Sequence, residues 1–347
     1  MKPDQYHPSL RPLEEACRLA ESDWICLRNP LVGFGERRSL IGKLLWKGAV
    51  MLRHAALVFR CWAVCSHPHI LIREFSTWPL LLVFPLLLPL RRKLFFVIHH
   101  NLQWAASSRI ERAGFTALAR LGARWVLFET QELAGLEALD IPSGQNLVLP
   151  HPVLESGVSP IILASPENTK IIGLTPPARP VIGVAGYNRP EKGSGELLKL
   201  LAECFPDCEL MLGTANPETI SGLPGVVQIV DTASDEAYSR MLAQCDVLVQ
   251  NSASNRYFYR VSGPVADAAA CGTAVIAPDF PLLQHQITSP VPVGEVFQRL
   301  EKMPQAVQTA IESARAGKYD FAAYCAARSA QALAECLDRF SRRRQDG

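Results

Sequence analysis

Short apolar segments rich in β-branched and aromatic residues recur along this chain, and turn-forming residues bound each of them. They cover residues 24–27, 69–72, 94–100, 125–129 and 147–150 in the first half, and 181–186, 209–213, 226–230, 246–250 and 274–278 in the second. Segments with helical periodicity lie between most of them, for example at 194–204, 234–244 and 264–271. This alternation predicts β-α-β units, in which helices cover both faces of a parallel sheet.

Two Rossmann-like, doubly wound α/β domains that face each other across a cleft are the fold that this pattern predicts. A length of 347 residues also favours two domains over one. Between the two sets of strands, residues 155–180 contain five prolines, which is typical of a connection. We therefore place the first domain at 1–165 and the second at 166–318, with a C-terminal helix at 319–343 able to pack back on the first.

The composition is that of a globular protein, with 48% hydrophobic residues and a net charge of +2. We expect no nucleic-acid partner, although the net charge itself says little about partners and its distribution says more. Basic residues concentrate in residues 35–95, where ten Lys and Arg accompany two acidic residues. The ten cysteines form no Cys-x-x-Cys pair, so zinc and redox motifs are unsupported and a reducing cytosol is expected. The first ten residues lack the apolar core of a signal peptide.

Residues 40–62 predict an amphipathic helix. Its basic side chains lie within one arc, and apolar side chains, two tryptophans among them, take most of the rest; the basic residues are Lys43, Lys47, Arg53, His54 and Arg60. Such a helix is typical of an interfacial anchor. The apolar segment 75–90 adds to this, but three prolines interrupt its 16 residues, and a spanning helix needs about 20. We expect peripheral attachment to the anionic inner face of the cell membrane; the alternative is a core helix with solvated charges.

A candidate anion site lies where Tyr-Arg-Val-Ser-Gly-Pro leads into the helix at 264–271. Ser262 is a natural N-cap, and Gly263 lets a ligand approach the backbone closely. The partial positive charge of a helix N-terminus suits a phosphate there, with Asp267 about one turn further on. The alternative is an ordinary capped helix.

A second candidate lies in the turn after the strand at 181–186. Arg189, Lys192 and Gly193 precede a helix that starts near Ser194, so two cations and a helix N-terminus meet at one edge of the sheet. That arrangement neutralises a diphosphate. Neither a Gly-x-Gly-x-x-Gly motif nor a Walker loop is present, which disfavours dinucleotides and triphosphates. A solvated turn is the alternative.

These two segments resemble the donor domain of GT-B glycosyltransferases, above all glycosyltransferase family 4. The residues that carry the resemblance are Gly-Tyr-Asn-Arg-Pro-Glu-Lys-Gly at 186–193 and Val-Ala-Asp-Ala-Ala-Ala-Cys-Gly-Thr-Ala-Val-Ile at 265–276. The resemblance covers roughly residues 20–300 and is specific in the second half. It implies transfer of a sugar, typically a hexose, from a nucleoside-diphosphate sugar, with no required metal or other cofactor.

Carried over by position, Lys192 matches the family's diphosphate-binding lysine. Tyr187 stands at the family's arginine position, so Arg189 is expected to supply that charge. Asp267 replaces the second glutamate of the Glu-x7-Glu motif, which holds the donor ribose. Tyr259 stands where the first glutamate is expected, and this loss leaves the stereochemistry of transfer open.

The loop that contains Tyr259 and Arg260 resembles a variant found in some bacterial exopolysaccharide transferases. In that variant Ser262 and Gly263 would contact the donor phosphates. The resemblance therefore implies a bacterial enzyme of surface polysaccharide synthesis, acting on a saccharide or lipid-linked saccharide.

The candidate general bases lie in the first domain. His99 and His100 end the apolar strand 94–100, where a strand would point them to opposite faces, so at most one is expected in the cleft. Glu74, after the strand 69–72, is a second candidate. Each could instead be structural. The rival functions are a catalytically silent GT-B subunit that scaffolds a partner, and a nucleotide-sugar epimerase.

Overall fold

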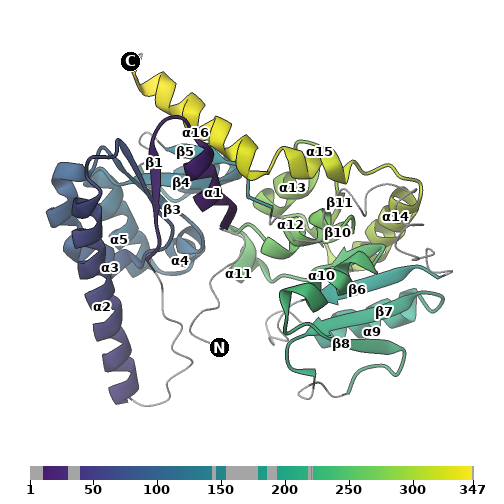
Figure 1. Cartoon of the computed structure of the whole chain (residues 1–347). Coiled ribbons are helices and arrows are strands. Elements are labelled where there is room, and N and C mark those ends of the chain that lie inside the picture. The colour runs from purple at the N-terminus through teal and green to yellow at the C-terminus, as the bar shows by residue number, and fades with distance from the viewer. Residues whose placement is uncertain are drawn as a thin grey trace. The chain divides into compact units, whose positions relative to one another are not determined.

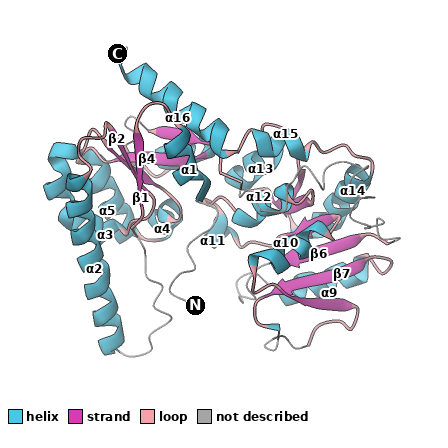
Figure 2. Cartoon of the chain, viewed as in Figure 1, coloured by secondary structure: helices cyan, strands magenta, loops and turns pink. Residues whose placement is uncertain are grey.

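The computed structural model describes residues 11–29, 40–142, 146–153, 179–185, 194–217, 220 and 222–345. The chain divides into two compact units, one formed by residues 1–152 with 330–347 and the other by 153–329. Each unit holds one all-parallel sheet with helices around it (Figures 1 and 2). The predicted α/β architecture of two domains, each built on a parallel sheet, is confirmed.

The sheet of unit 1 has five parallel strands in the order β1-β2-β3-β4-β5. Its residues in β2 and β3 are all buried, as expected for strands with helices on both faces. The strands are β1 (Trp24–Leu27), β2 (His69–Ile72), β3 (Leu94–Val97), β4 (Arg124–Phe128) and β5 (Leu147–Leu149).

Because these strands follow one another in sequence order, right-handed crossovers place all the connecting helices on one face of the sheet. The rings of Phe84 and Phe115 pack there on Phe96 and Trp125, with Phe115 and Trp125 stacked at 4.3 Å. The helices of this layer are α2 (Leu40–Ala63), α3 (Thr77–Val83), the 3₁₀ helix η2 (Phe84–Leu90), α4 (Asn101–Ser107), α5 (Arg109–Arg120) and α6 (Glu129–Ala138).

The opposite face of the same sheet is covered by α1 (Arg11–Leu19) and by α16 (Ala330–Gln345) from the far end of the chain. The indole N–H of Trp24 donates to the hydroxyl of Ser341 at 3.1 Å. The ring of Phe340 lies 5.4 Å from that of Phe95. Figure 1 shows α16 lying beside α1 at the end of the trace. Unit 1 is therefore built from two separated parts of the sequence.

The sheet of unit 2 has six parallel strands in the order β11-β10-β9-β6-β7-β8. The strand order reverses between β6 and β9, and open sheets bind ligands at the carboxyl ends of strands beside such a switch point. The strands are β6 (Val181–Ala185), β7 (Glu209–Thr214), β8 (Val227–Asp231), β9 (Val247–Val249), β10 (Ala274–Pro278) and β11 (Gly294–Phe297). The helices are α9 (Ser194–Cys204), α10 (Asp235–Ala243), α11 (Ser254–Tyr257), α12 (Gly263–Ala270), α13 (Pro281–Thr288), η5 (Leu300–Lys302), α14 (Met303–Arg315) and α15 (Phe321–Ala326).

Strand β11 was not expected from the sequence. It pairs in parallel with β10, with Val275 opposite Gly294. A Cβ atom on Gly294 would collide with the carbonyl oxygen of Val275. Glycine is thus required for the strand to approach β10 at this point.

The apolar segment 75–90 forms α3 and η2, which together stay short of a bilayer's thickness. Throughout the part of the chain that the structure describes, every helix is too short or too polar to cross a membrane.

Candidate functional site

Ser262 lies at the carboxyl edge of the second sheet, directly before α12. It occupies the N-cap position, but the predicted side-chain cap is wrong: its hydroxyl donates to Oε1 of Gln250 at 2.9 Å. Gln286 of α13 binds the backbone of the same residue twice. Its Oε1 accepts the Ser262 N–H and its Nε2 donates to the Ser262 carbonyl, each at 2.9 Å. Two glutamines therefore hold Ser262 at the start of α12. The sequence predicted that the Ser262 side chain alone would cap this helix.

Gln250 follows β9 at the switch point of the sheet. Its Nε2 is buried and has no hydrogen-bond partner among the described residues. A buried amide donor without a partner is uncommon, and a ligand oxygen is one group that satisfies such a donor. Gln250 is the last residue of the strand that the sequence predicts at 246–250. The sequence did not identify it as a site residue, because a single glutamine belongs to no known binding motif.

Asp267 lies one turn into α12 and is half-buried. Burial, and then the charge of Asp235 on α10, raises the pKa of this carboxyl to about 7. Its Oδ1 is buried and has no hydrogen-bond partner in the described part of the chain. Burial and the proximity of Asp267 also raise the pKa of Tyr238 well above its usual value. The carboxyl therefore lies near α10, with one oxygen that no described residue binds.

Tyr259 and Arg260 connect α11 to α12 and are both half-buried. The Tyr259 ring packs on that of Phe258 at 4.9 Å. The guanidinium of Arg260 lies 5.1 Å from the ring centre of Tyr257 and donates to the carbonyl of Arg256. The aromatic segment thus holds Arg260 against α11.

The predicted diphosphate-binding residues Arg189, Lys192 and Gly193 lie outside the described residues. They fall between the end of β6 at Ala185 and the start of α9 at Ser194. Their assignment stays a prediction.

His99 and His100 lie in the turn between β3 and α4, with His100 at the N-cap position of α4. The expectation that they point to opposite faces is wrong. The strand ends at Val97, so strand alternation does not extend to them, and their ring centres lie 4.0 Å apart. The His99 N–H donates to Oδ1 of Asn101 at 3.4 Å. The structure therefore presents the two imidazoles together, at the carboxyl end of a central strand.

Glu74 lies at the same edge, after β2, which pairs with β3. The preceding residue, Arg73, is 2% exposed and donates to Glu14 of α1, which also accepts from Arg28. Burial acts to raise the pKa of Glu14, but the hydrogen bonds from the two arginines outweigh it and the pKa is lowered. Glu74 is half-buried and follows directly on the buried ion pair of Arg73 with Glu14.

Helix α2 differs from the predicted arrangement. The basic arc was expected to face outward, but His54 is fully buried, with Nδ1 at 2.9 Å from the Val50 carbonyl and Nε2 accepting the Ser76 N–H. Burial lowers the pKa of His54. Part of the basic arc therefore faces the core. The sequence did not show this, because α2 carries apolar residues around most of its circumference.

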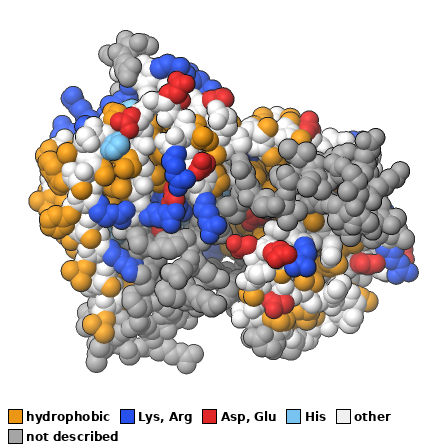
Figure 3. Space-filling view, viewed as in Figure 1, with side chains coloured by type: hydrophobic (Ala, Val, Ile, Leu, Met, Phe, Trp, Pro, Cys, Tyr) orange, Lys and Arg blue, Asp and Glu red, His pale blue; other side chains and the backbone are white. Residues whose placement is uncertain are grey.

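The outward face of α2 carries an exposed apolar stripe. Leu45, Leu52 and Phe59 recur every seven residues and are 64%, 73% and 76% exposed. That spacing keeps them on one side of the helix. Figure 3 shows apolar side chains gathered over α2 and α3 at the left of the view. This face of unit 1 is too apolar for an ordinary solvated helix.

Over the described residues, no three His, Cys, Asp or Glu side chains gather in a way that could hold a metal ion.

No protein-family model and no curated protein matches the sequence. Solved structures do match the fold. HepE from Anabaena, in complex with UDP-glucose, matches over 100% of this chain and 98% of its own, with a TM-score of 0.61 and 15% identity. A UDP-forming α,α-trehalose-phosphate synthase from Burkholderia xenovorans, in complex with glucose-6-phosphate, matches over 86% of this chain and 78% of its own, with a TM-score of 0.59 and 9% identity. The chain has the GT-B fold. At these identities the likeness concerns the GT-B fold alone.

Proposed function

We propose that this GT-B protein is a bacterial glycosyltransferase that moves a sugar, typically a hexose, from a nucleoside-diphosphate sugar to a saccharide or lipid-linked saccharide in surface polysaccharide synthesis. The observation that carries the proposal is the arrangement at the switch point of the second sheet. There Gln250 and Gln286 fix Ser262 at the start of α12, and a buried amide donor stays open. HepE, which shares the fold, binds UDP-glucose.

The donor diphosphate is proposed to bind at the start of α12, between Ser262, Gly263 and the side chains of Arg189 and Lys192. Helix N–H groups and two cations neutralise a diphosphate without a metal ion, so activity should survive chelation of divalent cations by EDTA. Gly193 would let the loop backbone approach the phosphates.

The rest of the donor is proposed to contact three residues of the same unit. Asp267 accepts hydrogen bonds from the ribose hydroxyls, as the resemblance to family 4 implies. Tyr259 and Arg260 form the adjoining wall, since Arg260 is held against α11 and the Tyr259 ring packs on Phe258.

The acceptor hydroxyl is proposed to lose its proton to His99 or His100 as the diphosphate leaves. A neutral imidazole accepts a proton near neutral pH, and a positioned general base contributes about 10²–10⁴-fold in rate. Glu74 is the next candidate, one strand away on the same edge.

The acceptor side is proposed to act at the inner face of the cell membrane, with the protein peripheral and cytoplasmic. The exposed stripe of Leu45, Leu52 and Phe59 supports this, together with Trp46 and Trp62, which are also exposed. Tryptophans beside an apolar stripe suit the boundary between head groups and acyl chains. The nearby Lys47 and Arg53 suit anionic lipid.

The test combines donor turnover with histidine variants. Purified protein is incubated with a panel of nucleoside-diphosphate sugars and a bacterial lipid extract, and nucleoside-diphosphate release and glycosylated product are measured. The His99→Ala and His100→Ala variants follow, with Gln103→Ala on α4 as a control for local packing. One histidine variant should turn over slowly and bind donor normally.

Other outcomes contradict the proposal in distinct ways. Conversion of the donor sugar without an acceptor would indicate an epimerase. Donor binding without transfer for any acceptor would indicate a silent scaffold. Normal turnover in both histidine variants would exclude these bases and direct the same test to Glu74→Gln.

A further inference from the structure

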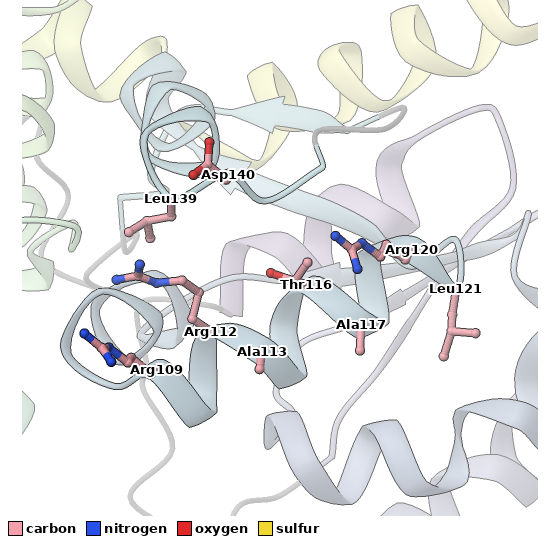
Figure 4. A pocket seen from close by; sticks show the side chains of 9 residues that line it. All are labelled: Arg109, Arg112, Ala113, Thr116, Ala117, Arg120, Leu121, Leu139 and Asp140. Atoms are coloured by element: carbon pink, nitrogen blue, oxygen red, sulfur yellow. The ribbon is translucent and has the colours of Figure 1, made fainter.

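A groove with three arginines in its lining lies between α5 and the end of α6, in the helical layer of unit 1. It encloses a volume of about 660 Å³. Helix α5 lines one side with Arg109, Arg112, Thr116 and Arg120, and Leu139 and Asp140 form the other (Figure 4). The groove belongs to none of the sites described above.

The groove carries uncompensated positive charge. Among the described residues, Arg109 and Arg120 form no ion pair. Arg112 donates to the carbonyls of Ala105 and Ala106 at 3.1 and 3.4 Å, which fixes its guanidinium without neutralising it. Asp140 is the one acidic residue of the lining, so three arginines against one carboxylate leave a formal charge of +2. Such a surface attracts anions.

The spacing of the arginines points to more than one anion. Arg109, Thr116 and Arg120 fall on one side of α5, because they are separated by seven and four residues. Arg109 and Arg120 lie 120 − 109 = 11 residues apart, which is about 16 Å along a helix axis. One small phosphate cannot reach both ends, whereas a row of head groups can. Guanidinium groups suit phosphate in particular because they donate two parallel hydrogen bonds to its oxygens.

The groove belongs to the same helical layer as the apolar stripe of α2. The indole N–H of Trp62 in α2 donates to the carbonyl of Leu86 in η2 at 3.2 Å, so α2 and η2 are in direct contact. Gly114 of α5 packs so closely on Trp78 of α3 that a Cβ there would lie 3.2 Å from the indole. Leu86 is 61% exposed and Ile110 of α5 is 69% exposed. Exposed apolar residues therefore continue from α2 to α5, where the arginines begin.

We propose that the arginine groove of α5 and α6 binds the phosphate groups of anionic membrane lipids and so orients unit 1 on the bilayer. This rests on the proposed membrane attachment. The apolar stripe inserts between acyl chains, and the arginines contact head groups beside it.

The experiment compares two double variants that lose the same charge. The double variant Arg109→Gln, Arg120→Gln removes the positive charges at the two ends of the groove. It leaves Arg112 in place, because the Arg112 side chain binds carbonyls of α4. Arg342→Gln with Arg343→Gln removes two exposed arginines from α16, which covers the opposite face of the sheet. Flotation with vesicles of phosphatidylcholine and phosphatidylglycerol measures binding. Thermal unfolding and nucleoside-diphosphate binding confirm that each variant is folded.

The groove variant should bind these vesicles about 30-fold more weakly, since each basic residue at an anionic surface contributes about 1 kcal/mol and 1.4 kcal/mol is tenfold. The α16 variant should bind as the wild type does. Equal loss in both variants, or no loss in either, overturns the groove as a lipid site. A third result also overturns it: the wild type binds inorganic phosphate by calorimetry, and the groove variant loses this binding but binds vesicles as the wild type does. The ligand of the groove is then a soluble anion.

If the wild type binds no vesicles but still transfers sugar to a soluble acceptor, the groove proposal and the membrane attachment fail together and the transferase stands. If vesicle binding follows the prediction but no sugar is transferred, the groove stands and the transferase fails.

Discussion

Replacing Gln286 with methionine tests whether the two-sided contact with Ser262 shapes the start of α12. The side chain of Gln286 is fully buried, and both ends of its amide bind the Ser262 backbone. Methionine fills a similar volume and forms neither hydrogen bond, so the change removes polar contacts with little loss of packing. Gln284→Met is the matched control, because Gln284 lies two residues earlier on α13 and is exposed.

The magnitude follows from what each backbone group of Ser262 retains. The carbonyl keeps a second hydrogen bond, from the Val265 N–H at 3.2 Å. The Ser262 N–H loses the partner that Gln286 provides, and a buried donor left without a partner costs about 1–3 kcal/mol. We therefore expect Gln286→Met to lower the free energy of unfolding by about 2 kcal/mol. For a folding unit of the size of unit 2, residues 153–329, that corresponds to roughly 4–8 °C in melting temperature.

Urea unfolding and calorimetric titration with a nucleoside diphosphate measure the two consequences. Donor affinity should fall as well, because the proposed phosphate site depends on the position of Ser262. If Gln286→Met unfolds within about 0.5 kcal/mol of the Gln284→Met control, the contact does not stabilise this edge of the sheet. If stability falls and affinity does not, Ser262 is not part of the donor site.

The remaining predictions concern a pH dependence, the membrane face and the donor loop. The pKa of Asp267, about 7 instead of 3.8, means that the native state keeps a proton that the unfolded chain releases. The free energy of unfolding should therefore fall as pH rises across that window, and Asp267→Asn should flatten the curve in urea unfolding; equal slopes would contradict the assignment. Leu52→Ser with Phe59→Ser should weaken vesicle binding at least about tenfold and leave unfolding unchanged, because both side chains are exposed; undiminished flotation would count against insertion of the stripe. Lys192→Ala should weaken nucleoside-diphosphate binding by about 1.5–3 kcal/mol, the scale of a charge-assisted contact, and unchanged affinity by calorimetry would remove Lys192 from the site.

The strands of both sheets were predictable because buried parallel strands need continuous apolar segments. Strand β11 was not, since Gly-Glu-Val-Phe is short, carries Glu295 and follows Pro290 and Pro292. The apolar segment 94–100 also runs on past the end of β3 at Val97, and this misplaced the two histidines. Hydrophobicity marks the core of a strand well and its end poorly.

The candidate site was predictable in position and not in its contacts. Ser-Gly-Pro marked the start of α12 from local preferences alone. The partner Gln286 lies 24 residues away from Ser262 on another helix, where no local pattern indicates a contact. The sequence also could not show which face of α2 is buried, because apolar residues occur on both sides of the helix. Only packing against the rest of unit 1 distinguishes the two sides.

The two-part construction of unit 1 has a consequence for biosynthesis. Helix α16 covers Trp24 and Phe95, yet it is translated only after all of unit 2, because it follows residue 329 in the sequence. The part of this aromatic face that α16 covers therefore stays open while all of unit 2 is translated, and it is a natural binding surface for chaperones during that time. A premature stop codon just before α16 would leave unit 2 whole and damage the unit that was made first.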